Sequence, residues 1–261
     1  MTSGPHHEHP VGGTDSAGQP WAGRSFGETP FADDDGSAPP EYLRAIGAFR
    51  AGRAAQADVV DALRGVRLLI PLVASLGESG TNERGVTVDK SADLAIVTVA
   101  GPDGRSVLPV FSSVAAMQAW NPKARPVPAD AVRVALAAAD ESTDLVVVDP
   151  TSDTEFVVRR PALWAVAQSK DWRSPLDDEA VSAEFASSAQ GEADVAGVSL
   201  RAGDPAAQLH GPELVVELAL RPGLDEAALS TLLSRLQDRW SRSEVIATRV
   251  DSLALRVVAA T

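Results

Sequence analysis

The apolar residues of this chain fall into short runs and helical stripes, and no run is longer than a strand. Continuous runs such as "LLIPLVA" at 68–74 and "LVVV" at 145–148 suit buried strands. The spacing of Tyr42, Leu43, Ile46 and Phe49 instead suits one face of an amphipathic helix. A membrane-spanning helix needs about 20 consecutive apolar residues, so none is expected. The pattern predicts an α/β (α+β) protein with a mixed sheet and flanking helices.

Composition divides the chain into four parts. Residues 1–39 are rich in Gly, Pro, Ser and Asp, which predicts a disordered acidic tail. Residues 40–172 alternate between strand and helix patterns and are expected to form the first α/β domain. Residues 173–194 are dominated by carboxylates, which predicts a flexible, self-repelling linker or hairpin loop. Residues 195–261 carry the pattern of a smaller β-α-β domain.

Turn, proline and helix patterns give further local predictions. "GPDG" at 101–104 predicts a hairpin between the strands in "DLAIVTVA" and "RSVLPVF", and "EFVVR" is expected to pair with "LVVV". Pro71 lacks a backbone donor, so its strand is expected at a sheet edge or at a bulge. The helix near 129–139 is predicted to bury Val132, Ala135, Leu136 and Ala139.

Charge and the lack of cysteine exclude several function classes. The chain has 36 acidic and 23 basic residues, a formal charge of −13 and no cysteine. We therefore expect no nucleic-acid partner, no disulfide and no thiolate chemistry. The pair Arg159 and Arg160 is expected to lie on a solvated face. "MTSGPHHEHPVGG" lacks the basic start and apolar core of a signal peptide, so a cytoplasmic protein without membrane contact is predicted.

No metal site, cofactor or catalytic set is predicted. The cluster of His6, His7, Glu8 and His9 lies in the flexible tail, without the fixed surroundings that a metal site needs. A serine nucleophile needs a base, and outside the tail the sequence contains only His210. These observations favour a protein that is not an enzyme.

The stretch "LPVFSSVAAMQAWNPKARPVP", 108–128, runs from a strand through two serines into a short helix. A serine at that junction is expected to cap the helix, which must end at Asn121 before Pro122. Asp149, which precedes a proline, is expected to start a turn by bonding to its own backbone. Aromatic and basic side chains gather at the junction, which predicts a binding surface. Its residues are Phe111, Ser112, Ser113, Trp120, Asn121, Lys123 and Arg125. Three aromatic residues of the tail, Trp21, Phe26 and Phe31, are predicted docking residues.

The same stretch, together with "LVVVDP", resembles the N-terminal domain of the bacterial SseB family over about Pro40 to Trp172. Residues 198–259 are similar, less specifically, to the family's C-terminal domain. The resemblance implies the fold, but it transfers no catalytic residue. Ser112 and Ser113 stand where a Thr-Ser pair is more usual, which keeps a hydroxyl at the helix start.

The leading hypothesis is a non-catalytic cytoplasmic protein that binds a protein partner through this surface. One alternative is a small-molecule sensor or enzyme acting on an amino-acid-related metabolite, suggested by the family's serine-sensitivity phenotype and by the polar groups of Ser112, Ser113 and Asn121. A secretion-associated role rests on the family name alone.

Overall fold

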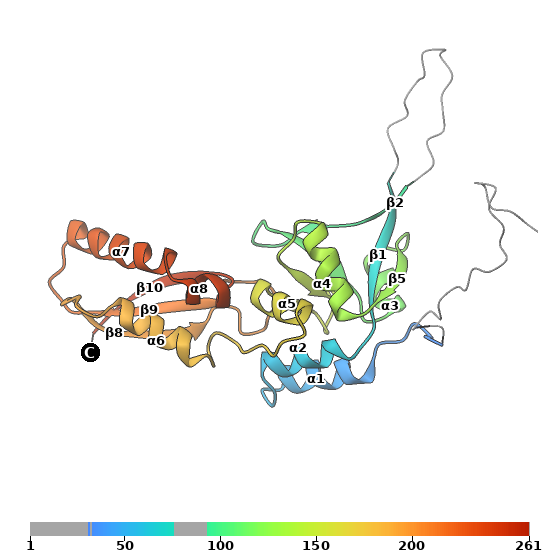
Figure 1. Ribbon diagram of the computed structural model, residues 1–261, viewed down its shortest axis with the longest axis horizontal. Coiled ribbons are helices and arrows are strands. Elements are labelled where there is room, and N and C mark those ends of the chain that lie inside the picture. Colours follow the sequence, from blue (N-terminus) through green and yellow to red (C-terminus); the bar gives the residue numbers. More distant parts are fainter. Residues whose placement is uncertain (1–30, 32, 76–92, 261) are drawn as a thin grey trace, which may run out of the picture. The chain divides into compact units, whose positions relative to one another are not determined.

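The computed structural model describes residues 31, 33–75 and 93–260 (Figure 1). The chain divides into two compact units, Met1–Asp35 and Gly36–Thr261. In the first unit, the backbone N–H of Asp34 donates to the carbonyl of Phe31 at 3.2 Å and closes a turn. Most of the predicted tail, residues 1–30, lies outside the described residues. All of the helices and strands below belong to the second unit.

The first sheet has the order β2-β1-β5, and both of its pairs are antiparallel. Its central strand, β1, contains Pro71, which faces Pro126, while Leu69 faces Pro128. The backbone of Leu69 turns away from β5 and exchanges hydrogen bonds of 2.8 and 2.9 Å with Phe111. By the alternation of an antiparallel ladder, Pro71 also turns its missing N–H away from β5. β1 is the central strand and its register with β5 has no shift, so the expectation of an edge strand or a bulge is wrong. Pro71 is tolerated because the ladder to β2 begins only at Leu72, so that among the described residues no ladder pair lies on the side of its missing N–H. The strands are β1 (Leu68–Ser75), β2 (Asp93–Ile96) and β5 (Arg125–Ala129).

The second sheet has the order β3-β4-β6-β7, in which β4 and β6 are parallel and the other pairs antiparallel. The hairpin predicted at 101–104 is confirmed, because Ala100 pairs with Ser106. The predicted pairing of β6 with β7 is also confirmed. The segment 93–100 does not form one strand, since its first part pairs with β1 and its last part with β4. The strands are β3 (Val99–Ala100), β4 (Ser106–Val110), β6 (Val146–Val148) and β7 (Phe156–Val158).

Helices α1, α2, α4 and α5 contribute side chains to the main core between these sheets. In α4 the buried residues are Ala131, Val134, Ala135 and Ala138, while Leu136 is 54% exposed. The predicted stripe was thus correct only at Ala135. An alanine-rich helix is apolar on several faces, so periodicity alone does not set which face is buried. The helices are α1 (Pro40–Arg50), α2 (Gln56–Arg64), α3 (Val114–Trp120), α4 (Ala131–Asp140) and α5 (Arg160–Ala167).

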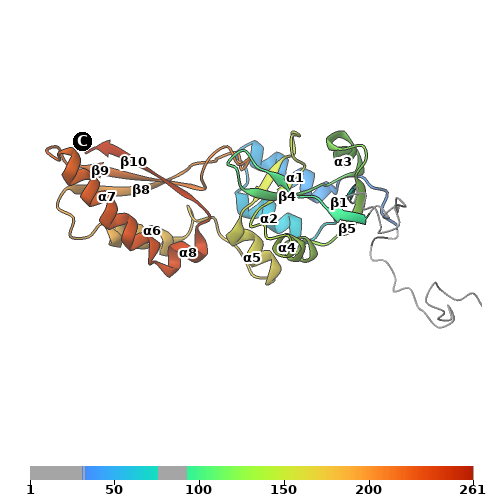
Figure 2. The same cartoon turned by 90° about the horizontal axis from the view of Figure 1, so that it is seen from above.

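The C-terminal sheet has the order β10-β9-β8. β8 and β9 are antiparallel, and β9 connects through α7 and α8 to the parallel strand β10, which confirms the predicted β-α-β pattern. Helices cover one face of this sheet (Figure 2). The elements are β8 (Val195–Ala202), β9 (Leu214–Leu220), α7 (Glu226–Ser241), α8 (Glu244–Arg249) and β10 (Leu253–Ala259).

The acidic stretch 173–194 contains a helix, α6 (Glu179–Ser188), where a flexible linker was predicted. Asp178 caps this helix, and Val181 and Phe185 are buried in the C-terminal core. The linker interpretation is therefore wrong for the helical residues, because two apolar side chains outweigh the surrounding charge. The four-part division of the chain stays a prediction.

The loop between β8 and β9, residues 203–213, is called the arm below. It packs against the N-terminal half of the unit: Ala207 and Leu209 are buried among that half's core residues. The N–H of Val157, on the edge strand β7, donates to the carbonyl of Ala207 at 2.8 Å. The arm therefore covers an edge that would otherwise expose unpaired backbone groups.

The predicted fold class is confirmed: over its described residues the chain is a mixed α+β protein with eight helices and three sheets. In the described ranges, none of the helices combines the length and the apolarity that crossing a membrane requires.

Replacing Phe185 with alanine tests the packing of α6. Phe185 is fully buried and its ring centroid lies 5.4 Å from that of Trp240. We expect Phe185→Ala to lower the free energy of unfolding by about 3–5 kcal/mol in urea titrations. The exposed Ser182→Ala on the same helix is the control, with a change within about 0.5 kcal/mol. Equal stability of the two variants would return 173–194 to the flexible-linker interpretation.

Candidate functional site

The exposed residues between α3 and β5 form the candidate site predicted from the sequence. We call Trp120, Asn121, Lys123, Arg125 and Val127 the α3–β5 strip. Trp120 is partly buried, Val127 is 38% exposed, and the two cations are exposed. Neither cation forms a salt bridge or a side-chain hydrogen bond with any described residue. The strip therefore presents apolar surface beside free positive charge.

Local sequence explains the shape of the strip. Ser113 caps α3, because its Oγ accepts the N–H of Ala116 at 3.0 Å, as predicted for one of the two serines. The helix ends at Asn121, which is extended before a proline, also as predicted. The Asn121 Oδ1 accepts the N–H of Lys123 at 3.0 Å and shapes the turn into β5. The Trp120 ring leans on Phe111, with ring centroids 5.3 Å apart.

Two residues of the predicted surface are inside the protein. Phe111 is fully buried in a small cluster with Leu69 and Met117. Ser112 is 2% exposed. Neither can contact a partner directly, because both side chains are enclosed by the protein. Phe111 instead supports Trp120 from below.

Ser112 belongs to a buried polar centre around Asp149. The Ser112 N–H and hydroxyl donate to the two Asp149 carboxylate oxygens at 2.7 and 2.6 Å. The Thr154 hydroxyl donates to the same carboxylate at 2.8 Å. Asp149 directly follows β6, and Ser112 comes two residues after the end of the parallel strand β4, so both lie at the carboxyl edge of the sheet. Polar residues that follow two parallel strands come together at one edge of a sheet. This pattern in the sequence could have predicted the contact between Ser112 and Asp149.

A turn does begin at Asp149, as predicted, since its carbonyl accepts the Ser152 N–H at 3.2 Å. The predicted cause is wrong, because the carboxylate accepts from Ser112 and Thr154 and not from its own local backbone. Asp149 has φ +49°, a left-handed conformation that costs a non-glycine residue energy and needs surrounding support. Tyr42 supplies part of that support by donating its hydroxyl to the Thr154 carbonyl. Burial, with a smaller effect from the Asp149 charge, holds the pKa of Tyr42 well above its usual range. All of these groups are engaged with one another, which favours a structural role.

A second polar centre joins the two halves of the unit, and sequence reasoning missed it. Arg159, expected on a solvated face, is buried and donates to Asp204 of the arm at 2.7 Å and to Asp251 at 3.1 Å. Arg105 of the hairpin makes two bonds of 3.0 Å to the Asp251 carboxylate. The residues come from distant parts of the chain, so no sequence spacing predicts them.

Glu213 lies beside this centre with one oxygen unused. Its Oε2 accepts the Asp251 N–H at 2.6 Å, whereas its buried Oε1 has no hydrogen-bond partner among the described residues. Burial raises the pKa of Glu213 to about 7; the Asp251 N–H and the charges of Arg159 and Arg160 lower it, and the Asp251 charge raises it. Burial raises the pKa of Asp251, but the hydrogen bonds and charges of Arg105 and Arg159 lower it by more. The pKa of Asp251 therefore lies below its ordinary value.

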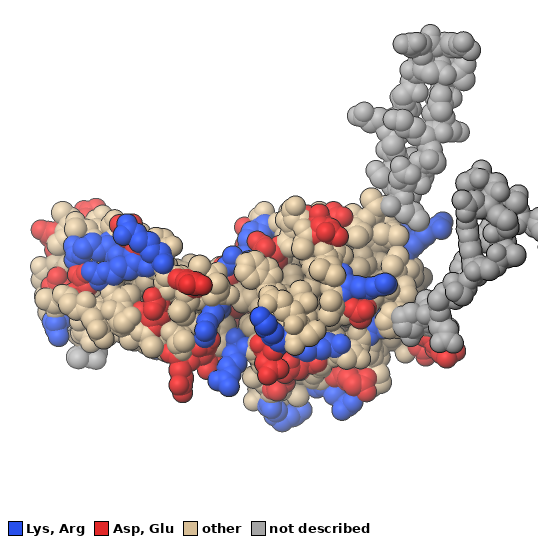
Figure 3. Space-filling model, in the orientation of Figure 1, with Lys and Arg blue, Asp and Glu red and all other residues tan. Residues whose placement is uncertain are grey.

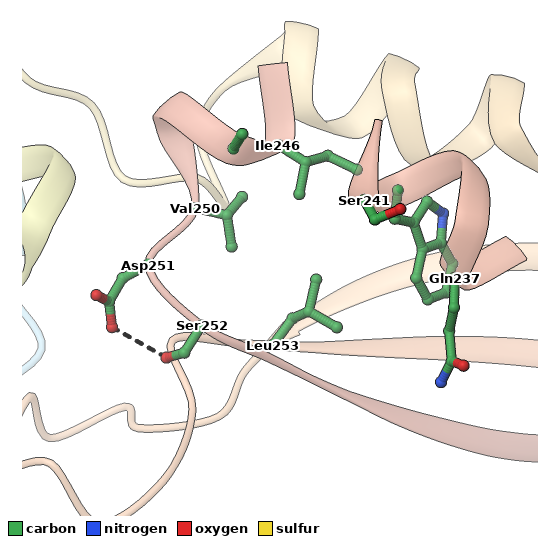
Figure 4. Close-up of a pocket in the computed structure, with 9 residues that line it drawn as sticks. Gln237, Ser241, Ile246, Val250, Asp251, Ser252 and Leu253 are labelled. Carbon is green, nitrogen blue, oxygen red and sulfur yellow. Dashed lines mark hydrogen bonds between the residues drawn. The ribbon is translucent and has the colours of Figure 1, made fainter. Parts of the chain in front are cut away.

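An apolar pocket of about 360 Å³ lies between α7, α8 and the start of β10. Ile246, Val250 and Leu253 point toward one another across it (Figure 4). Asp251 and Ser252, joined by a hydrogen bond of 3.0 Å, form one end of the pocket. The pocket can take a small apolar group, but its walls offer few polar groups to orient one.

Basic side chains also gather over α7 (Figure 3). There Arg235 and Arg239 both pair with Glu192, at 2.6 and 2.7 Å. Their charge is thus partly neutralised inside the molecule. This pairing distinguishes them from Lys123 and Arg125.

The predicted docking residues Trp21 and Phe26, and the histidine cluster at 6–9, lie outside the described residues. Phe31 is described, in the turn of the first unit. Their docking role stays a prediction.

Residues 41–165 match the family model of the SseB protein N-terminal domain. The resemblance seen in the sequence is thereby confirmed for this part of the chain, and the C-terminal similarity stays a prediction. No curated protein and no solved structure was found to match the chain.

Replacing Ser112 with alanine tests the buried centre. The variant removes a hydroxyl that donates to a buried carboxylate, so we expect the free energy of unfolding to fall by about 1.5–3 kcal/mol in urea titrations. The exposed Ser106→Ala in β4 is the control, with a change within about 0.5 kcal/mol. If both variants cost the same, the Ser112–Asp149 contact contributes nothing to stability.

Replacing Glu213 with glutamine tests the raised pKa. Between the ordinary pKa of 4.5 and the folded value of about 7, the folded state holds a proton that the unfolded state has lost. Wild-type stability therefore falls as pH rises through this window, by up to about 3 kcal/mol. The glutamine keeps an oxygen for the Asp251 N–H and carries no charge.

We expect Glu213→Gln to match the wild type near pH 4 and to exceed its free energy of unfolding by about 1–3 kcal/mol near pH 8. Glu141→Gln, at an exposed glutamate after α4, should show no such pH dependence. A Glu213→Gln variant less stable than the wild type at the higher pH would contradict the assignment.

Proposed function

We propose that this chain, whose residues 41–165 match the SseB protein N-terminal domain, is a non-catalytic binding protein that contacts a protein partner through the α3–β5 strip. The observation that carries the proposal is that Lys123 and Arg125, beside Trp120 and Val127, form no salt bridge with any residue that the structure describes. A cytoplasmic location is part of the proposal, supported by the absence of cysteine from the sequence.

Trp120 has the properties of a contact residue. It is partly exposed, yet Phe111 fixes its ring from below at 5.3 Å. A ring that is already held loses little conformational freedom on binding, so more of its contact energy is available to the complex. Tryptophan and arginine also dominate the binding energy of protein interfaces.

The backbone of β5 favours contact through side chains. β5 is an edge strand of its sheet, and its outward positions are Pro126 and Pro128. Neither proline has an N–H to offer a partner strand, so the edge resists pairing with a further strand. The partner is therefore expected to bind through its side chains. It would offer carboxylates to Lys123 and Arg125 and an apolar residue to Val127.

The sensor-or-enzyme alternative loses support at Ser112, whose hydroxyl is buried and bonded to Asp149. Its remaining groups at the same junction are Ser113, which caps α3, and Asn121, which shapes a turn. A secretion-associated role gains no support from the geometry.

Charge reversal on the strip is the test. We expect Lys123→Glu with Arg125→Glu to weaken capture of the partner from a lysate of the source cells by at least about tenfold, because like charges would then face one another. Capture by the wild type should also weaken as salt is raised. The measurement is quantitative mass spectrometry of the captured proteins.

The matched control is Arg53→Glu with Arg242→Glu, which changes the net charge equally at exposed positions outside the strip. It should leave capture unchanged, as should deletion of residues 1–30 if the strip is the contact. Equal loss in both double variants, or no loss in either, would contradict the strip as the binding surface.

A further inference from the structure

A polar cleft of about 580 Å³ lies where the arm meets the β3–β4 hairpin. This volume is within the range of small-molecule sites, about 300–1,000 Å³. Pro102, Leu209 and Pro212 supply apolar walls, and Asp103, Arg105 and His210 supply polar groups. Asp251 and Ser252 close the cleft on the side of the buried centre. It lies apart from the α3–β5 strip and shares no residue with it.

The arm is built to hold this shape. Asp204 accepts the N–H groups of Gln208 and Leu209 at 3.1 and 2.7 Å. Leu209 has φ +60°, a conformation that a non-glycine residue adopts only when its surroundings impose it. The Leu209 side chain is buried, and the next residue, His210, is exposed and lines the cleft.

The close approach of the arm's two ends is also specific to glycine. A Cβ atom on Gly203 would lie 2.3 Å from the Pro212 carbonyl oxygen, and one on Gly211 would lie 2.4 Å from the Gly203 carbonyl oxygen. Only residues without a side chain allow these backbones to meet. The walls of the cleft are therefore fixed before any ligand arrives.

The charges at the cleft select the sign of a ligand. The Arg105 guanidinium donates to both Asp251 carboxylate oxygens, and its Nε donates to the Asp103 Oδ2 at 2.6 Å. Arg159 behind it is likewise bonded to two carboxylates, those of Asp204 and Asp251. The centre thus holds three carboxylates, those of Asp103, Asp204 and Asp251, against two arginines.

Both arginines are already neutralised, so the cleft offers little attraction to an anion. The carboxylates retain unused acceptor sites: each Asp103 oxygen accepts one bond, and its side chain is 29% exposed. A carboxylate oxygen can accept two.

From these features we propose that the cleft binds a small organic cation: a primary ammonium group that donates to Asp103, on a short apolar body that packs against Pro102, Leu209 and Pro212. The site is preorganised by the arm, and its specificity comes from the excess of carboxylates.

The test is a titration of the ¹⁵N-labelled full chain with n-butylammonium chloride, followed by amide chemical shifts. Saturable shifts are expected for the amides of Asp103, Arg105, His210 and Ser252. At matched ionic strength, 1-butanol, which has the same body without the charge, should bind more weakly, and sodium butyrate should not bind there.

Charge changes at exposed His210 give the sharpest comparison, because they leave the buried contacts intact. We expect His210→Lys to weaken butylammonium binding by at least about threefold and His210→Glu to strengthen it by a similar factor. Asp103→Asn should weaken binding as well, whereas Asp153→Asn, at an exposed aspartate outside the cleft, should not.

Three outcomes would overturn the proposal. Butyrate could bind the cleft more tightly than butylammonium, the butylammonium shifts could fail to saturate, or the two His210 variants could bind it equally. Because the cleft and the strip share no residue, none of these results bears on the proposed protein partner.

Discussion

The Arg159 guanidinium is the contact on which the arrangement of Gly36–Thr261 most depends. It follows β7, is almost fully buried, and reaches both Asp204 of the arm and Asp251 before β10. Removing one partner of such a buried pair typically costs about 3–5 kcal/mol, because the other charge is left without compensation. Around it, Ala207 and Leu209 of the arm fill space in the N-terminal core. The two halves are thus held by a charged centre with apolar contacts on each side, and the cleft is a consequence of how the arm reaches that centre.

Polar groups have two separate roles in this chain. Those of Ser112, Asp149 and Thr154 are buried and bonded to one another, so they fix the loops that follow parallel strands β4 and β6. Those of Lys123 and Arg125 lie on the surface, with no side-chain partner in the described part of the chain. The two neighbouring serines differ in role: Ser113 caps a helix and Ser112 holds a buried carboxylate. Both roles are structural, so the proposed binding surface lies beside the serines and does not include Ser112.

Local patterns predicted much of the fold. The "GPDG" hairpin, the pairing of β6 with β7, the cap before α3 and the β-α-β order near the C-terminus all depend on neighbouring residues, and all are present. The errors share a different cause. The buried face of α4 and the packing of α6 are set by partners far along the chain, and an alanine-rich or acidic stretch carries little information about them. Pro71 was misplaced because its consequence depends on ladder parity, which is known only once the partner strand is known.

Of the candidate site, the sequence by itself determined the residue types at the end of α3, their charge and the proline that stops the helix. It also determined the fold class, since runs and stripes of apolar residues follow directly from the two backbone periodicities. Only the tertiary structure decided that Phe111 and Ser112 are buried while Lys123 and Arg125 are exposed, and that Arg159 is bonded to two carboxylates. Those outcomes depend on contacts such as Ser112 with Asp149 and Arg105 with Asp251, which are 37 and 146 residues apart. Spacing along a chain cannot encode such pairings, because burial and charge compensation are properties of the assembled core.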